Sequence, residues 1–233
     1  MQTIPKLPTQ KKYAVAFVDV LGISNKIEKD SEWALFWVWF LYNSTLSVWG
    51  NHERIKIKIF SDNILICEEI SPTNPNVAIM EVLSVVDTLE KSVFNTGALF
   101  LRGAVVVDDF YFSDNFVYGK ALLQAYTMES TSVIYPRIVV DQSVFNFIDK
   151  EKLLVKLDSD GLYFYDFLQS RINNGGNRLS QQLETLQANI IINVKSNLNV
   201  ESVMTKMKWL ISYFNKACLA NGINRTLSLD NIL

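Results

Sequence analysis

The chain has 233 residues, and its 22 lysines and arginines against 24 aspartates and glutamates give a formal net charge of −2. Hydrophobic residues make up 49% and charged residues 20% of the chain, a globular composition that excludes a disordered, collagenous or coiled-coil protein. A charge this close to zero creates no global field that attracts nucleic acid or anionic lipid, so we expect neither nucleic acid nor a membrane as a partner.

The start of the chain, its longest apolar run and its cysteines all favour a cytoplasmic protein. Residues 1–17 are polar and contain proline before the first apolar run, unlike a signal peptide. The unbroken apolar run at 33–42 is too short for a membrane span, which needs about 20 residues. Cys67 and Cys218 lie in apolar stretches without the spacing of metal ligands, so we expect both thiols to be buried.

The first elements alternate between strand and helix patterns. Residues 13–20 are short, apolar and rich in valine and phenylalanine, which predicts a buried strand that ends near Asp19. A helix is predicted to follow, capped at Ser31 and Glu32 and running toward Gly50. This helix is apolar nearly all round, so it lies either in the centre of a core or against a second subunit, and we favour the second.

The next elements predict the fold class. They are, in chain order, strands at 54–60 and 64–67 around a tight polar turn, a helix at 75–95, a strand at 99–107, a helix at 118–129 and a strand at 138–140. The first six elements follow the order βαββαβ, the plan of a ferredoxin-like antiparallel sheet in the α+β class.

The last third of the chain predicts an extension of this sheet and a helical tail. Two strands are expected within 153–168, around a turn at 158–161, and residues 173–177 look like a linker. Two helical patterns fill 178–220 and predict a helical hairpin. We therefore divide the chain into a tail (1–12), a catalytic domain (13–170) and a C-terminal extension (171–233) packed on the domain or on a partner.

Two aspartates are the strongest candidates for chemistry. Asp19 ends the first strand and Asp62 lies in the tight turn of the next hairpin, and the βαββαβ plan makes these strands neighbours. Two carboxylates without histidine or cysteine suit Mg²⁺ or Mn²⁺ better than zinc. A pair of such ions, about 3.5–4 Å apart, activates a hydroxyl and neutralises a triphosphate. The spacing alone is equally consistent with two aspartates that bind no metal, one at the end of a strand and one in an ordinary Asx turn.

The segments around these aspartates, 17–24 (FVDVLGIS) and 58–62 (KIFSD), resemble the two metal motifs of class III nucleotidyl cyclases. Further segments are similar to that family over about residues 13–220. They are 101–104 (LRGA) and 118–121 (YGKA) followed by Glu129, and also 135–138 (YPRI) and 208–215 (KWLISYFN), which resemble the small stand-alone bacterial cyclases of the Pycsar antiphage system. Those cyclases make cyclic pyrimidine nucleotides.

The resemblance implies roles for several residues. Asp19, Asp62 and the carbonyl of Val20 would bind two divalent ions, Mg²⁺ or Mn²⁺. The backbone amides of Gly22 and Ile23 would meet the β- and γ-phosphates of a nucleoside triphosphate, where glycine permits a close approach.

The strand at 54–60 carries the cations that would meet the base. Lys58 falls where purine cyclases of the family place a base-reading lysine, although on an alternating strand it is equally a solvated or partner-pairing lysine. Arg54 and Lys56 share its face by the period of two, so this strand could direct three cations toward a base or phosphate.

One departure from the family concerns the transition state. Purine cyclases place an asparagine and an arginine where this chain has Leu123 and Thr127. Either the protein is inactive or another cation stabilises the α-phosphate, and Arg102 is our candidate. Arg102 interrupts the apolar run at 99–107, and a buried arginine needs an anionic partner, either a protein carboxylate or a ligand phosphate. Arg137 is expected to be structural.

The favoured hypothesis is a homodimeric, metal-dependent cyclase. It would convert UTP (or CTP) to the 3′,5′-cyclic monophosphate and diphosphate, as a second messenger in antiphage defence. UTP is favoured because Lys58 or Arg54 can donate a hydrogen bond to O4 of uracil. The alternatives are an inactive cyclase-like nucleotide-binding and dimerisation module, and a purine nucleotide cyclase. Diguanylate cyclase chemistry lacks support because its Gly-Gly-acidic-acidic-Phe hairpin is absent.

Overall fold

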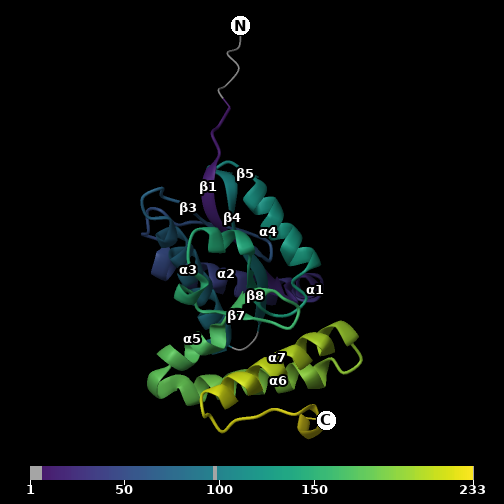
Figure 1. The fold of residues 1–233 in the computed structure, drawn as a ribbon. Helices are drawn as coiled ribbons and strands as arrows, with labels where there is room; N and C mark the ends of the chain where they lie inside the picture. Colours follow the sequence, from purple (N-terminus) through teal and green to yellow (C-terminus); the bar gives the residue numbers. More distant parts are fainter. Residues whose placement is uncertain (1–6, 97–98, 233) are drawn as a thin grey trace.

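The computed structural model describes residues 7–96 and 99–232, which form a mixed α+β fold around one large sheet (Figure 1). The strands are β1 (Lys11–Leu21), β2 (Lys56–Phe60), β3 (Asn63–Glu69), β4 (Phe100–Phe112), β5 (Val117–Gly119), β6 (Ile138–Val140), β7 (Val155–Leu157) and β8 (Tyr163–Tyr165). The α-helices are α1 (Ile23–Lys29), α2 (Ser31–Trp49), α3 (Pro75–Thr96), α4 (Lys120–Thr131), α5 (Phe167–Asn174), α6 (Leu179–Ser196), α7 (Glu201–Ala220) and α8 (Leu229–Ile232).

The sheet has the predicted ferredoxin-like core. Its strand order is β2-β3-β1-β4-β6-β8-β7, with β5 paired to β4. β1 is antiparallel to both β3 and β4, which places Asp19 opposite Asn63 on one side and opposite Arg102 on the other. A strand flanked on both sides and covered on both faces must be apolar throughout, which explains the uninterrupted run at 14–18. The predicted fold class is confirmed.

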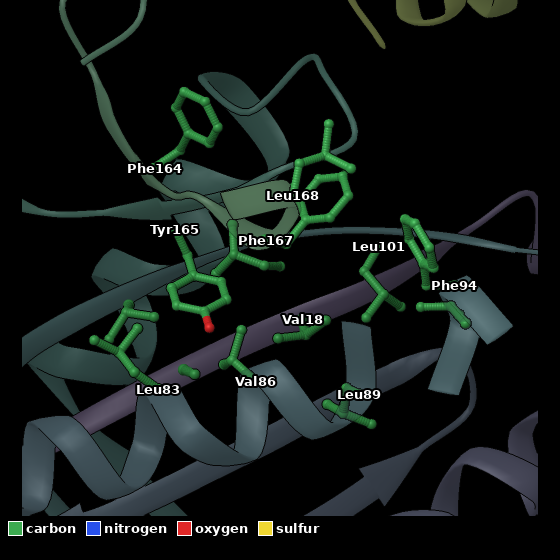
Figure 2. Packing of buried hydrophobic residues seen from close by; sticks show 14 of the residues in the cluster. Val18, Leu83, Val86, Leu89, Phe94, Leu101, Phe164, Tyr165, Phe167 and Leu168 are labelled. Atoms are coloured by element: carbon green, nitrogen blue, oxygen red, sulfur yellow. The ribbon is translucent and has the colours of Figure 1, made fainter. Parts of the chain in front are cut away.

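The two faces of the sheet carry different cover. Val18 belongs to the larger core, where Val86 and Leu89 of α3 pack beneath the strands (Figure 2). Phe17, its neighbour in sequence, points to the opposite face and joins a smaller cluster with Ala121 and other residues of α4. The helices α2 and α3 therefore cover one face, and α4 covers the other.

Several boundaries differ from the predictions for local reasons. Asp30, not Ser31, caps α2, because its side chain accepts a hydrogen bond from the backbone N–H of Trp33 at 3.1 Å. The sequence patterns did not predict α1, α5 or β5. The segment expected to be a linker, 173–177, holds the end of α5 and most of a 3₁₀ turn at Gly176–Arg178.

The C-terminal helices pack on the domain, and α6 and α7 lie side by side below the sheet in Figure 1. Trp209 of α7 donates a hydrogen bond to Asp158 at 2.7 Å, in the turn between β7 and β8. The fully buried Arg137 forms ion pairs with Asp158 and Asp160 and lies beside the rings of Tyr135 and Trp209. The structural role predicted for Arg137 is therefore confirmed.

Two further sequence predictions concern single features. Cys67 and Cys218 are both buried free thiols, as expected. Across the described residues, no helix combines the length and the apolar character that a membrane crossing would require.

Candidate active site

The ends of β1 and of the β2–β3 hairpin bring the two aspartates together. The backbone N–H of Val20 donates a hydrogen bond to the carbonyl oxygen of Asp62 at 3.1 Å, and the side-chain amide of Asn63 donates to the Asp62 carboxylate at 3.1 Å. Ser61 has a φ of +58°, which lets two residues close the turn between the strands. The structure thus places Asp19 and Asp62 on adjacent strand ends, as the topology predicted.

The charges of the two carboxylates act on each other. Burial raises the pKa of Asp19, the ion pair with Arg102 opposes this rise, and the negative charge of Asp62 adds to it. A neighbouring cation relieves this repulsion. The site therefore favours binding of positive charge next to Asp19.

Arg102 bridges the site to helix α4. Its Nε donates a hydrogen bond to Oδ2 of Asp19 at 2.8 Å, and one of its terminal nitrogens lies 2.7 Å from Oε1 of Glu129. Burial raises the pKa of Glu129, Arg102 opposes this rise, and the charges of Asp19 and Asp62 add to it. Two carboxylates thus hold one guanidinium group, so Arg102 has the protein partners expected of it. Arg102 also lines an open hollow, which leaves space for a phosphate beside it.

Sequence reasoning noted Glu129 only as part of the family resemblance and did not place it in this site, and it missed Lys206 altogether. Glu129 follows Ala121 and Ala125 at intervals of four, and all three are buried, so a lone acid on the buried face of a helix was the available signal. Lys206 lies on α7, and its pKa is lowered by burial and by the positive charge of Arg102, while Asp19 opposes this change. No local pattern distinguishes Lys206 from the other lysines of the tail.

The turn after Asp19 has the backbone that a phosphate-binding loop needs. Gly22 has a φ of +85°, in the left-handed region where glycine is favoured, and α1 starts at the following residue, Ile23. The Ile23 side chain is fully buried, which anchors the turn. The amides of both residues thus lie at the end of β1, close in sequence to Asp19.

The structure does not gather the three cations of the hairpin at one place. Lys58 donates hydrogen bonds to the carbonyl oxygens of Ser113 and Asp114, both at 2.8 Å, and its Nζ lies 5.0 Å from the centre of the Phe112 ring. Lys56 donates to the carbonyl oxygen of Glu53 at 2.6 Å. Both bind backbone oxygens of their own chain.

Arg54 lies apart from the site, contrary to expectation. It precedes β2 and forms ion pairs with Glu68 and Glu81, toward the α3 side of the sheet. Burial, together with the hydrogen bond that the protonated Glu68 shares with Glu81 and the negative charge of Glu81, raises the pKa of Glu68 to about 8. The period of two failed here because the strand begins only at Lys56.

The outer side of α4 is open and apolar. Leu123 and Thr127, the positions where purine cyclases hold an asparagine and an arginine, are both exposed. A hollow of about 760 Å³ lies beside Leu123, and its apolar lining includes Phe17, Phe60, Tyr118, Leu123 and Tyr126. This face has room for a ligand or a second subunit.

The donor set at the strand ends fits a hard divalent cation. Among the residues that the structure describes, no group of three or more histidine, cysteine, aspartate or glutamate side chains forms a metal centre. Asp19 and Asp62 provide two carboxylates, which suits Mg²⁺ because this ion keeps several ligands from water or phosphate. Their mutual repulsion is the property that a bound cation would remove.

Comparison with known proteins identifies the fold. No protein-family model and no curated protein matches the sequence. A bacterial light-regulated adenylyl cyclase superposes with a TM-score of 0.51 at 11% identity, covering 77% of this chain and 100% of that one. The fold is that of a class III nucleotidyl cyclase catalytic domain.

Two further solved structures are similar but superpose less well. The adenylyl cyclase CyaB from P. aeruginosa has a TM-score of 0.49 at 16% identity, covering 68% of this chain and 95% of that one. The guanylyl cyclase domain of the RhoGC fusion protein from the fungus Blastocladiella emersonii has a TM-score of 0.49 at 18% identity, covering 68% and 98%.

Proposed function

We propose that this protein is a metal-dependent nucleotidyl cyclase. The observation that carries the proposal is the position of Asp19, Asp62 and Arg102 on neighbouring strand ends within a cyclase fold. In this reaction the ribose 3′-oxygen forms a bond to the α-phosphorus, the bond to the β-phosphate oxygen breaks, and diphosphate leaves. The hydroxyl proton passes to water, so the reaction requires no side-chain base.

The residues of the chain have separate tasks in this proposal. Asp19 and Asp62, with the carbonyl of Val20, would hold the divalent ions, Mg²⁺ or Mn²⁺. Such an ion, when bound, supplies Lewis-acid stabilisation of phosphate charge and lowers the pKa of the 3′-hydroxyl. The amides of Gly22 and Ile23 would bind the β- and γ-phosphates.

Arg102 takes the part of the missing transition-state arginine in this account. The guanidinium group is held by Asp19 and Glu129, so its position is fixed before substrate arrives. A donor that is already in place stabilises developing negative charge without having to reorganise. Arg102 is shared between the carboxylates of Asp19 and Glu129, so binding of a divalent ion at Asp19 would free part of its positive charge for the phosphates.

The proposed substrate is a pyrimidine nucleoside triphosphate, UTP before CTP, and the proposed product a second messenger in antiphage defence. The support is the sequence resemblance at 135–138 and 208–215. Lys58 would donate a hydrogen bond to O4 of uracil. To do so, its ammonium group would give up its hydrogen bonds to the carbonyl oxygens of Ser113 and Asp114.

The proposed active form is a homodimer. On the open face near α4, the exposed fractions of Tyr118, Leu123 and Tyr126 are 65%, 67% and 53%. On the opposite side of the sheet, α2 exposes Leu35, Phe36, Trp39 and Tyr42, as expected of a helix without a polar face. Exposed apolar surface of this extent marks an interaction site.

The experiment that tests the function is incubation of the purified chain with each of the four ribonucleoside triphosphates and Mn²⁺. Chromatography then identifies the product, and Asp62→Ala is the matched inactive control. We expect cyclic UMP to be the main product. Cyclic AMP or cyclic GMP would instead support the purine alternative, and no product from any of the four would support the inactive module.

A further inference from the structure

A second hollow adjoins the candidate active site. It has a volume of about 420 Å³ and lies between the end of α4 and the beginning of α7. Its polar lining comes from β4, α4 and α7 and comprises Arg102, Ser130, Thr131, Glu201, Ser202, Thr205 and Lys206. In Figure 1, α7 begins on the side of the molecule where α1 and the end of α4 lie. The volume falls within the range of about 300–1,000 Å³ of small-molecule sites.

The charges that border this hollow favour an anion. Burial lowers the pKa of Lys206, the positive charge of the nearby Arg102 lowers it further, and the negative charge of Asp19 opposes this change. Arg102 has two carboxylate partners, whereas Lys206 forms no hydrogen bond or ion pair within the described chain. Among residues 7–96 and 99–232, the exposed Glu201 is the one carboxylate that lines the hollow. A partly buried ammonium group beside another cation is unfavourable unless an anion balances it.

The position of the hollow indicates which anion this is. Arg102 lines the hollow and also donates a hydrogen bond to Asp19, so the hollow adjoins the proposed metal carboxylates. A triphosphate whose α-phosphate lies at Asp19 and Asp62 must extend its β- and γ-phosphates into neighbouring space. The hydroxyls of Ser202 and Thr205 provide further donors along the wall.

We propose that Lys206 of the C-terminal helix binds the β- and γ-phosphates of the substrate, and the departing diphosphate, together with Arg102. The inference rests on the proposed function and adds to it a role for the C-terminal extension. Arg102 would keep its role at the α-phosphate, and Lys206 would add a second cation, from α7 of the same chain, for the outer phosphates. The helical hairpin α6–α7 would then be part of the active site rather than only a structural support.

The test is calorimetric titration of the full chain with inorganic diphosphate in Mg²⁺, which needs no turnover. Lys206→Met keeps an unbranched side chain of nearly the same length and removes its charge, and Lys208→Met on the exposed side of the same helix is the matched control. We expect Lys206→Met to weaken diphosphate binding by about 10- to 100-fold, the usual effect of one charge-assisted hydrogen bond, and Lys208→Met to bind like the wild type. Lys206→Arg should retain most of the affinity.

Folding and site identity are checked on the same proteins. Lys206→Met should melt at the wild-type temperature or higher, because it removes the repulsion by Arg102. If it melts lower, Lys206→Arg decides: retained binding supports the proposal, and lost binding overturns it. Diphosphate must also compete with 3′-deoxyuridine triphosphate, which cannot cyclise, since binding without competition would indicate a separate anion site and overturn the proposal.

The two proposals fail differently. If the chain cyclises a nucleotide but Lys206→Met leaves diphosphate affinity, KM and inhibition by diphosphate unchanged, the role of Lys206 is wrong and the function stands. If no nucleotide is cyclised but diphosphate binding still depends on Lys206, the phosphate site stands and the function is wrong.

Discussion

Removal of Arg102 is the perturbation for which the structure gives the most detailed expectation. Arg102→Gln deletes a cation whose side chain is 26% exposed and leaves the carboxylates of Asp19 and Glu129, 13% and 5% exposed, without it. Breaking a buried ion pair from one side costs about 3–5 kcal/mol. Because Arg102 is partly exposed, we expect the lower end, about 3 kcal/mol at pH 8. For a chain of this size that is a fall in Tm of about 6–12 °C.

The loss should depend on pH with a definite sign. The pKa values of Asp19 and Glu129 already lie above their ordinary values, and removing Arg102 raises them further. A group whose pKa is raised on folding contributes stability below its unfolded pKa and loses that contribution as the pH rises through its folded pKa. The difference in stability between Arg102→Gln and the wild type should therefore be small at pH 4 and grow toward pH 8.

Thermal denaturation followed by circular dichroism between pH 4 and pH 8 measures this difference. The matched control is Arg102→Gln combined with Glu129→Gln, which removes the unpaired buried charge and should recover part of the lost stability at pH 8. An equal loss at pH 4 and pH 8, or a double variant less stable than the single one, would refute the assignment of Arg102 as the neutralising partner of these carboxylates.

Three further predictions concern the metal site, a buried acid and the dimer. Asp62→Ala should abolish cyclic nucleotide formation and leave Tm unchanged or slightly higher, because it removes a charge that repels Asp19; retention of most of the turnover in a chromatographic assay would contradict the metal role. Burial raises the pKa of Glu90 to about 8, so Glu90 stabilises the fold below about pH 4.5 and loses this contribution as the pH rises toward 8. Glu90→Gln should accordingly flatten the dependence of Tm on pH between 5 and 8, and an unchanged slope would show that Glu90 does not titrate there. In the family arrangement Lys58 and Asp62 serve opposite sites of the dimer, so an equimolar mixture of inactive Lys58→Ala and Asp62→Ala should recover about a quarter of wild-type activity after subunit exchange. No recovery after confirmed exchange would count against the shared sites.

The sequence predicted those parts of the site that depend on neighbouring strands. Asp19 stood out because it ends an apolar strand, and Asp62 because it lies in a tight turn, and strand order alone brought the two together. The order of elements predicted the ferredoxin-like core for the same reason: each signal was local, and the topology of βαββαβ units is restricted.

The remaining residues of the site depend on how separate elements dock. Arg102 meets Glu129 only because α4 packs on β4, and it approaches Lys206 only because the C-terminal hairpin packs beneath the domain. No periodicity encodes either contact. For Arg54 a local pattern was misleading, because the alternation of basic and apolar residues assigned it to the site. The strand begins two residues later, and the Arg54 side chain forms ion pairs with Glu68 and Glu81 instead.

Phosphorus-31 NMR tests the central claim most directly. The protein is incubated with UTP and Mn²⁺, and the Mn²⁺ is removed by chelation before the spectrum is recorded. Cyclisation predicts equal amounts of a cyclic phosphodiester and diphosphate, with neither formed by Asp62→Ala. Release of orthophosphate with a nucleoside diphosphate would show hydrolysis rather than cyclisation, and that result, or unchanged UTP, ATP, GTP and CTP in parallel samples, would contradict the account.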